Sequence, residues 1–203
     1  LPSALAKGLV TAAEIDAAVL RVLILKQRLG LFDDPYRSLP ADMNTGAAHA
    51  RRLELAREAA RRSIVLLQDP RDILPLPTET RRILLVDATG GAPADLFGPW
   101  AACGNASEVV SVAEGLRAAW PAATVDVVDT TDSVPADALI GPAVAKAADA
   151  GIVILRLGER AEMSGEASSR ADPVVPSDQR RLAEALIAAG RPVVVLLASG
   201  RPL

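Results

Sequence analysis

Apolar and polar residues alternate in blocks over residues 81–203. Four short runs of branched apolar residues have the length of strands, at residues 83–86, 125–128, 152–157 and 193–198. Helical spacing of apolar residues lies between them, at residues 109–120, 136–150 and 177–189, the last with Ser177 as N-cap. Continuous apolar runs of this length are typical of strands buried on both faces of a parallel sheet. The pattern therefore predicts an α/β fold with a mostly parallel, doubly wound sheet, an α/β sandwich.

The first 80 residues follow a different pattern. Thr11 and Glu14 have the spacing of a capping box, which predicts a helix that begins there and ends near Gly30. A second helical pattern, at residues 46–62, carries arginines and glutamates at i,i+4 positions, as a solvated helix face does. The apolar run at residues 63–67 predicts a short strand, and the prolines that follow indicate a linker or an edge hairpin.

These patterns divide the chain into three segments. Residues 1–36 are expected to be the tail of a preceding domain, residues 37–80 a linker helix with a leading strand, and residues 81–203 the α/β domain. The chain begins with Leu rather than Met and stops directly after a strand. We therefore expect a part of a longer gene product, with a sheet that is incomplete at its C-terminal edge. Such a sheet would expose a strand edge or be covered in a homo-oligomer.

Composition restricts the possible partners. Of 203 residues, 50% are hydrophobic, 23% are charged and only 2% are aromatic, which indicates a globular protein with an aliphatic core. The net charge of −3 and the scarcity of aromatic residues argue against nucleic acid. No apolar run approaches the roughly 18 residues of a membrane span. Cys103 and His49 are single, so neither a disulfide nor a histidine-rich metal site is expected, and both periplasm and cytoplasm stay open.

The loop Gly158–Arg170 carries the most chemistry in the chain. It follows a predicted strand, and the carboxyl ends of strands are where ligands gather in open α/β sheets. Three carboxylates compete within it, those of Glu159, Glu162 and Glu166. Glu159, at the strand end, suits an ion-paired or backbone-bonded role. Glu166, between a glycine and small residues, has the freedom of approach that a general acid needs.

For the other candidate positions, a purely structural role stands beside the functional one. Trp100 lies in a Gly-Pro-Trp loop, where an indole either stacks on a sugar or packs the loop. Trp120 ends a predicted helix and is expected in the core. The glycine-rich turn at residues 87–91 lacks the GxGxxG pattern, which favours an ordinary turn over a nucleotide site. Cys103 has no histidine nearby and is expected to be a small buried or loop residue rather than a nucleophile.

Several motifs together are characteristic of one family. They are Met163-Ser164-Gly165-Glu166-Ala167-Ser168-Ser169-Arg170, Gly190-Arg191-Pro192, Gly200-Arg201-Pro202-Leu203 and, earlier, Gly98-Pro99-Trp100. The set resembles the second domain of family 3 glycoside hydrolases, closest to the bacterial β-glucosidase type. Residues 21–36 resemble the end of that family's TIM-type barrel, and residues 56–76 resemble the passage into its α/β sandwich. The resemblance covers nearly the whole chain.

The resemblance implies a retaining glycosidase that hydrolyses terminal β-linked glucosyl-type residues with two carboxylates on two domains. A barrel aspartate would be the nucleophile, and Glu166 of this chain would be the general acid/base. Met163, Ser164 and Arg170 would shape the loop, and Trp100 is a further candidate for loop shaping or substrate contact.

The implied partners are a carbohydrate substrate and the N-terminal barrel of the same protein, with no cofactor, metal, nucleic acid or membrane. Because the nucleophile would lie in the barrel, the chain alone is expected to be inactive. The alternative interpretation of the sequence is a non-catalytic α/β module for ligand binding or scaffolding.

Overall fold

A computed structural model describes the chain except residues 40–45, 92, 102–103 and 131–133. The prediction for Cys103 therefore concerns a residue outside the described part. Residues form two compact units, Leu1–Leu67 and Gln68–Leu203. None of the helices in the described part is long and apolar enough to cross a membrane.

The described residues of the first unit form three helices. They are α1 (Pro2–Ala6), α2 (Ala12–Arg28) and α3 (Gly46–Ser63). The predicted capping box of α2 is confirmed, because the amide of Glu14 donates to Thr11 Oγ1 at 3.2 Å and the Glu14 carboxylate accepts from the Thr11 amide at 2.8 Å. Hydrogen bonds from the backbone and side chain of Thr11 hold the pKa of Glu14 below its ordinary value. The local sequence is thus sufficient to begin this helix.

The strand predicted at residues 63–67 is wrong. Helix α3 continues to Ser63, whose hydroxyl donates to the carbonyl of Ala60. Residues 64–67 have no regular structure, and Ile64 and Leu67 are 79% and 73% exposed. A β-strand requires a neighbour for its backbone groups, and among the described strands none pairs with this segment. The apolar pattern therefore predicted a strand, but among the described strands this segment has none to pair with.

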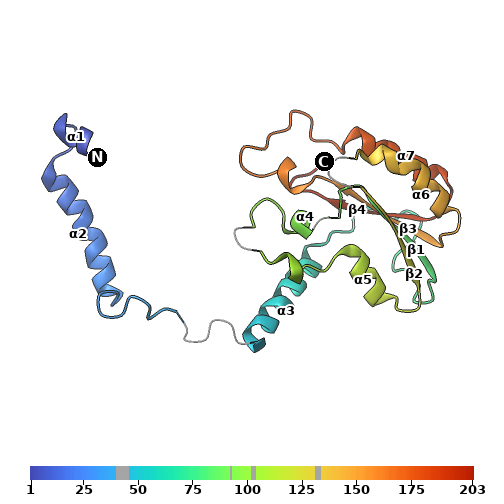
Figure 1. Cartoon of the computed structure of the whole chain (residues 1–203), viewed down its shortest axis with the longest axis horizontal. Helices are drawn as coiled ribbons and strands as arrows, with labels where there is room; N and C mark the ends of the chain where they lie inside the picture. The colour runs from blue at the N-terminus through green and yellow to red at the C-terminus, as the bar shows by residue number, and fades with distance from the viewer. Residues whose placement is uncertain (40–45, 92, 102–103, 131–133) are drawn as a thin grey trace. The chain divides into compact units, whose positions relative to one another are not determined.

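In the second unit, the strands of the described residues form a four-stranded sheet. Its strands are β1 (Arg82–Asp87), β2 (Thr124–Asp129), β3 (Ile152–Gly158) and β4 (Val193–Ala198). They lie in the order β2-β1-β3-β4 and every pair is parallel (Figure 1). The predicted α/β fold with a parallel, doubly wound sheet is confirmed.

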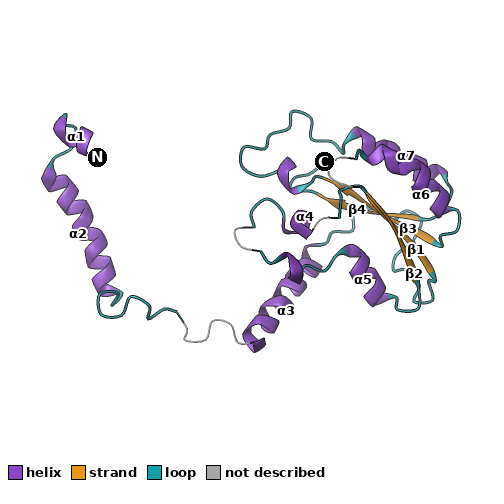
Figure 2. Ribbon diagram, viewed as in Figure 1, coloured by secondary structure: helices purple, strands orange, loops and turns teal. Residues whose placement is uncertain are grey.

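Helices cover both faces of the sheet. They are α5 (Val112–Ala119) on one face, and α6 (Ile140–Ala147) and α7 (Ser177–Ala188) on the other (Figure 2). Side chains of β1 alternate accordingly: Ile83 and Leu85 belong to the core layer with α5, whereas Leu84 and Val86 belong to the layer with α6 and α7. The winding direction reverses between β1 and β3, so this arrangement brings the loops after these strands to one edge of the sheet.

Two helix starts differ from the sequence prediction. Helix α5 begins at Val112 rather than at residue 109, because Ser111 and Glu114 form a capping box, and a 3₁₀ turn, η1 (Ala106–Glu108), precedes it. Ser177 is not the N-cap of α7. Pro176 holds that position and Ser177 is the first helical residue.

Other short elements also differ from the predicted set. The segment at residues 136–150 is a 3₁₀ turn, η2 (Ala136–Leu139), followed by α6. A short helix α4 (Pro93–Phe97) and a 3₁₀ turn η3 (Ala161–Met163) were not predicted, and both lie beside the candidate site.

Strand β4 lies at an edge of the sheet. Among the described strands it pairs with β3 alone, and Val195, Leu196 and Leu197 remain exposed. This agrees with the expected open edge, and the homo-oligomer stays a prediction.

Candidate active site

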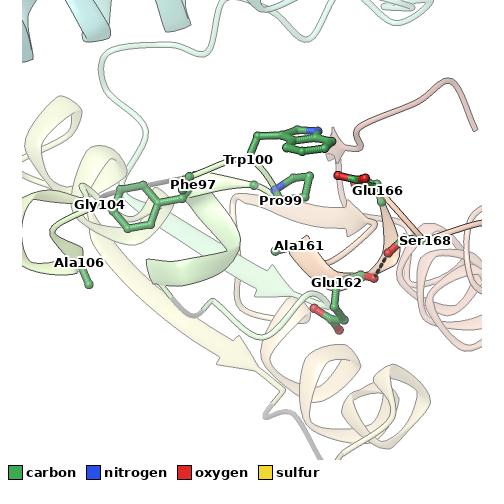
Figure 3. A pocket seen from close by; sticks show the side chains of 12 residues that line it. Phe97, Pro99, Trp100, Gly104, Ala106, Ala161, Glu162, Glu166 and Ser168 are labelled. Atoms are coloured by element: carbon green, nitrogen blue, oxygen red, sulfur yellow. Dashed lines mark hydrogen bonds between the residues drawn. The ribbon is translucent and has the colours of Figure 1, made fainter. Parts of the chain in front are cut away.

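A cavity of about 640 Å³ lies beside the loop that follows β3. It is lined by the α4 region and by that loop, namely by Phe97, Gly98, Pro99, Trp100, Ala101, Gly104, Ala106, Ala161, Glu162, Ser164, Glu166 and Ser168. Two sequence motifs far apart in the chain, the Gly-Pro-Trp loop and the acidic loop, are therefore neighbours (Figure 3).

Glu166 is exposed, and its carboxylate lies close to the indole of Trp100 in Figure 3. Gly165 explains how the two loops approach so closely. A Cβ atom on Gly165 would lie 2.8 Å from Cβ of Pro99, and the residue has φ +104°. A larger residue would push Glu166 away from Trp100, which is itself 71% exposed.

The backbone on the other side of Glu166 is also unusual. Ala167 has φ +62°, a left-handed conformation that costs a non-glycine residue about 1–2 kcal/mol. Glu166 thus lies between two left-handed residues, and strained backbone of this kind tends to cluster at functional sites. The turn leaves Glu166 exposed at the cavity.

Glu159 is the opposite of Glu166, because its side chain is fully buried. Arg170 Nη1 donates to its Oε1 at 2.8 Å, and Ser199 Oγ and Arg201 Nε donate to its Oε2 at 3.0 and 3.2 Å. Burial alone would raise the pKa of Glu159, but Arg170, Ser199 and Arg201 together hold it below its ordinary value. The ion-paired role expected at the strand end is confirmed.

The remaining residues assigned to the loop take up structural positions around it. Ser164 is buried, and a Cβ atom on Gly200 would lie 2.6 Å from its Oγ, so the chain passes very close here. Met163 accepts a hydrogen bond from Arg201 through its carbonyl at 2.8 Å. Arg170 joins Glu159 to the carbonyl of Val174, which its Nη2 reaches at 2.8 Å.

The sequence assigned no role to two further residues that anchor the loop. Gln179 is buried at the start of α7, accepts from the amide of Gly158 at 2.8 Å and donates to its carbonyl at 3.0 Å. Asp95 of α4 accepts from the amide of Ala161 at 3.1 Å. Both contacts join residues that are far apart in sequence, so spacing carries no signal for them.

The carboxylate in the glycine-rich turn after β1 is already bonded to neighbouring groups of the chain. The buried carboxylate of Asp87 pairs with Arg156 at 3.0 Å and accepts from the amide and hydroxyl of Thr89 at 2.9 and 2.7 Å. Trp120 packs against the core layer of α5, as expected, and its indole donates to the carbonyl of Pro77 at 3.0 Å. Among the residues that the structure describes, no group of His, Cys, Asp and Glu is placed to hold a metal.

Residues 64–203 match the family model described as the glycosyl hydrolase family 3 C-terminal domain. The chain belongs to this family. The resemblance found in its motifs is thereby confirmed. The match covers the whole α/β unit with its cavity, so Glu166 and Trp100 lie on a glycoside hydrolase domain.

Curated and solved relatives agree with this membership. The periplasmic beta-glucosidase of Salmonella typhimurium is 35% identical over the whole chain, and Beta-D-xylosidase 1 of Arabidopsis thaliana is 30% identical over 98% of it. The crystal structure of a beta-glucosidase from Listeria innocua in complex with glucose aligns with the whole chain at a TM-score of 0.83 and 36% identity. The chain spans 30%, 26% and 27% of the lengths of these three proteins, respectively.

Proposed function

We propose that this chain supplies the general acid/base of a retaining, exo-acting β-glycosidase of the β-glucosidase type, with Glu166 as that residue. The observation that carries the proposal is the exposed Glu166, presented into an open cavity between two left-handed residues on a family 3 domain. The acid would protonate the departing glycosidic oxygen, and its conjugate base would then activate a water molecule.

The choice among the three carboxylates of the loop rests on their surroundings. The carboxylate of Glu159 is enclosed by two arginines and a serine and has no access to a substrate. Glu162 lines the same cavity but pairs with Arg160 at 3.1 Å. Glu166 is hydrogen-bonded to no other described residue, so its carboxyl is available for proton transfer.

Retention requires a second carboxylate about 5 Å from the first, and it acts as the nucleophile. We assign it to an N-terminal barrel domain, because the chain spans only about 30% of the beta-glucosidase relative. In this assignment residues 1–36 are the tail of that barrel, residues 37–80 the connection, and residues 81–203 the acid/base domain. Met163, Ser164 and Arg170 shape the loop.

The stereochemistry of hydrolysis tests the retaining mechanism. A longer protein that carries both domains should release the β-anomer first from an aryl β-glucoside, and proton NMR during the first minutes of the reaction would detect it. An aryl β-xyloside should be assayed in parallel, because both glucosidases and xylosidases are among the relatives. Initial release of the α-anomer would contradict the mechanism.

The isolated 203-residue chain is expected to give no turnover of aryl β-glucosides, because general acid catalysis without a nucleophile leaves the glycosidic bond intact. Release of nitrophenol by the isolated chain should match that of its Glu166→Ala variant and of buffer. Turnover that depends on Glu166 in the isolated chain would show that the nucleophile has been placed in the wrong domain.

Trp100 is proposed to contact the leaving group, since its exposed ring flanks Glu166 in the cavity. Trp100→Ala in the two-domain protein should lower kcat/KM for an aryl β-glucoside about three- to tenfold, as the loss of one aromatic contact predicts. Methyl β-glucoside, which offers no ring to stack on, should be affected less. Trp100→Phe is the control that keeps a ring, and an equal loss on both substrates would favour a loop-packing role.

A further inference from the structure

Arg201, in the segment that follows β4, connects three parts of the loop Gly158–Arg170, the acid/base loop. Its Nε donates to Glu159 Oε2 at 3.2 Å, and its Nη2 donates to the carbonyls of Met163 and Ser168 at 2.8 and 3.1 Å. Met163 precedes Glu166 and Ser168 follows it, so one guanidinium holds the chain on both sides of the proposed acid/base.

Arg201 is itself fixed to the sheet. Glu159 follows β3 directly, and its amide donates to the carbonyl of Ala198, the last residue of β4, at 2.9 Å. Ser199 donates to Glu159 Oε2 and accepts from the amide of Arg201 at 3.2 Å. Hydrogen bonds with a charged partner are roughly twice as strong as neutral ones. The ends of β3 and β4 thus determine where the guanidinium lies.

The loop has a specific need for this support. Glu166 lies between Gly165 at φ +104° and Ala167 at φ +62°, a conformation that persists only where the surroundings hold it. No other described residue hydrogen-bonds the carboxylate of Glu166, so the backbone of residues 163–168 determines where that carboxylate lies. The contacts of Arg201 with the carbonyls of Met163 and Ser168 are made on that backbone.

We propose that Arg201 is a positioning residue for Glu166: held by Glu159, it clamps the carbonyls of Met163 and Ser168 and thereby keeps the acid/base loop in its projecting conformation. This role rests on the proposed function of Glu166. Arg201 touches no substrate in this proposal and acts only through the loop.

Arg201→Lys in the two-domain protein tests the clamp, because a lysine keeps a positive charge but has only one nitrogen, which cannot take the places of both Nε at Glu159 and Nη2 at the two carbonyls. We expect kcat/KM for an unactivated β-glucoside to fall about tenfold or more, since misplacement of a catalytic group by about 1 Å can cost 10²-fold. Dinitrophenyl β-glucoside, whose leaving group needs no proton, should lose less than about threefold.

Arg181→Lys is the matched control. Arg181 also pairs with a carboxylate, that of Asp137, but it lies on α7 and is half exposed. Arg181→Lys should leave both substrates unaffected. An equal loss on both substrates in Arg201→Lys would overturn the positioning role, because a general loss of folded structure has no leaving-group dependence.

A double variant shows whether Arg201 acts through Glu166. In a Glu166→Ala background, Arg201→Lys should cause no further loss with the unactivated substrate, because the group that it positions is gone. Two losses that multiply would overturn the proposal.

Hydrogen exchange separates this proposal from the proposed function. Peptides that cover residues 163–168 should exchange about tenfold faster in Arg201→Lys, in line with the loss of charged hydrogen bonds, while α6 and α7 remain unchanged. Unchanged exchange in the loop would refute the clamp whatever Glu166 does. Suppose that exchange is faster in Arg201→Lys but that the activity loss in Glu166→Ala does not depend on the leaving group. The clamp would then be supported, and the acid/base role of Glu166 would be refuted. Should Arg201→Lys fail to fold, Ser199→Ala must loosen the same peptides, or the clamp is refuted.

Discussion

Replacing Glu166 with alanine in a protein that carries both domains is expected to lower kcat/KM for an unactivated β-glucoside by about 10²–10⁴-fold, the usual contribution of a general acid. Dinitrophenyl β-glucoside should keep its kcat/KM within about tenfold, because its phenolate departs without a proton. Its kcat should nevertheless fall, since the second step requires the same residue as a base. Steady-state kinetics with both substrates measures this difference.

Sodium azide should restore much of the kcat of Glu166→Ala on the dinitrophenyl substrate. The truncated side chain leaves room for a small anion that attacks without base assistance, and the product would be the β-glucosyl azide. Glu162→Ala is the matched control, because Glu162 is also an exposed carboxylate at the same cavity. Its loss should be small and independent of the leaving group. Equal losses on both substrates in Glu166→Ala, without azide rescue, would contradict the assignment.

The sheet could be predicted well from the sequence because its signal is local. Each strand is a short branched apolar run, and the run at residues 193–198 matches β4 without any shift. The same signal failed at residues 63–67, where an equally apolar run has no regular structure and is exposed. An apolar run predicts a need for burial, but whether a neighbouring strand satisfies that need depends on tertiary structure. The prediction of Ser177 as the N-cap of α7 was wrong by one residue, because Pro176 holds the N-cap position.

The candidate site was predicted only in its local part. The sequence placed Glu166 in the loop that follows β3, and small neighbours together with the family resemblance favoured it over Glu159 and Glu162. The proximity of Glu166 to Trp100 depends on Gly165, because the absence of a side chain there allows the two loops to approach each other. Arg201 had no visible role in the sequence, because its contacts reach back over 42, 38 and 33 positions in the chain. The fold brings these residues together through the pairing of β3 with β4.

Glu159→Gln is expected to destabilise the α/β unit by about 3 kcal/mol, the lower end of the cost of breaking a buried ion pair. The side chain of Glu159 is fully buried, and removal of its charge leaves Arg170 and Arg201 without their anionic partner. These two arginines retain some contact with water, which keeps the loss from being larger. Urea unfolding at neutral pH measures the difference. Glu184→Gln is the control, because Glu184 forms an exposed pair with Arg180 on α7 and its removal should leave the midpoint unchanged.

The pH dependence of this difference identifies the charge of Glu159 as its cause. Burial opposes ionisation, but Arg170, Ser199 and Arg201 outweigh it and hold the pKa of Glu159 below its ordinary value in the folded protein. A carboxyl group whose pKa is lowered by folding stabilises the folded protein fully at pH values above its unfolded pKa, which is about 4.3 for a glutamate. This stabilisation is lost as the pH falls through the pKa of the folded state. The stability difference between the wild type and Glu159→Gln should therefore be full at pH 6 to 7 and shrink at increasingly acidic pH below about 4.

Glu14 and Glu114 also have lowered pKa values, caused by hydrogen bonds in their capping boxes, but they contribute equally to both proteins and cancel in the difference. A difference that stays constant down to pH 3 would show that the variant acts through packing rather than through the ion pairs that fix Arg201.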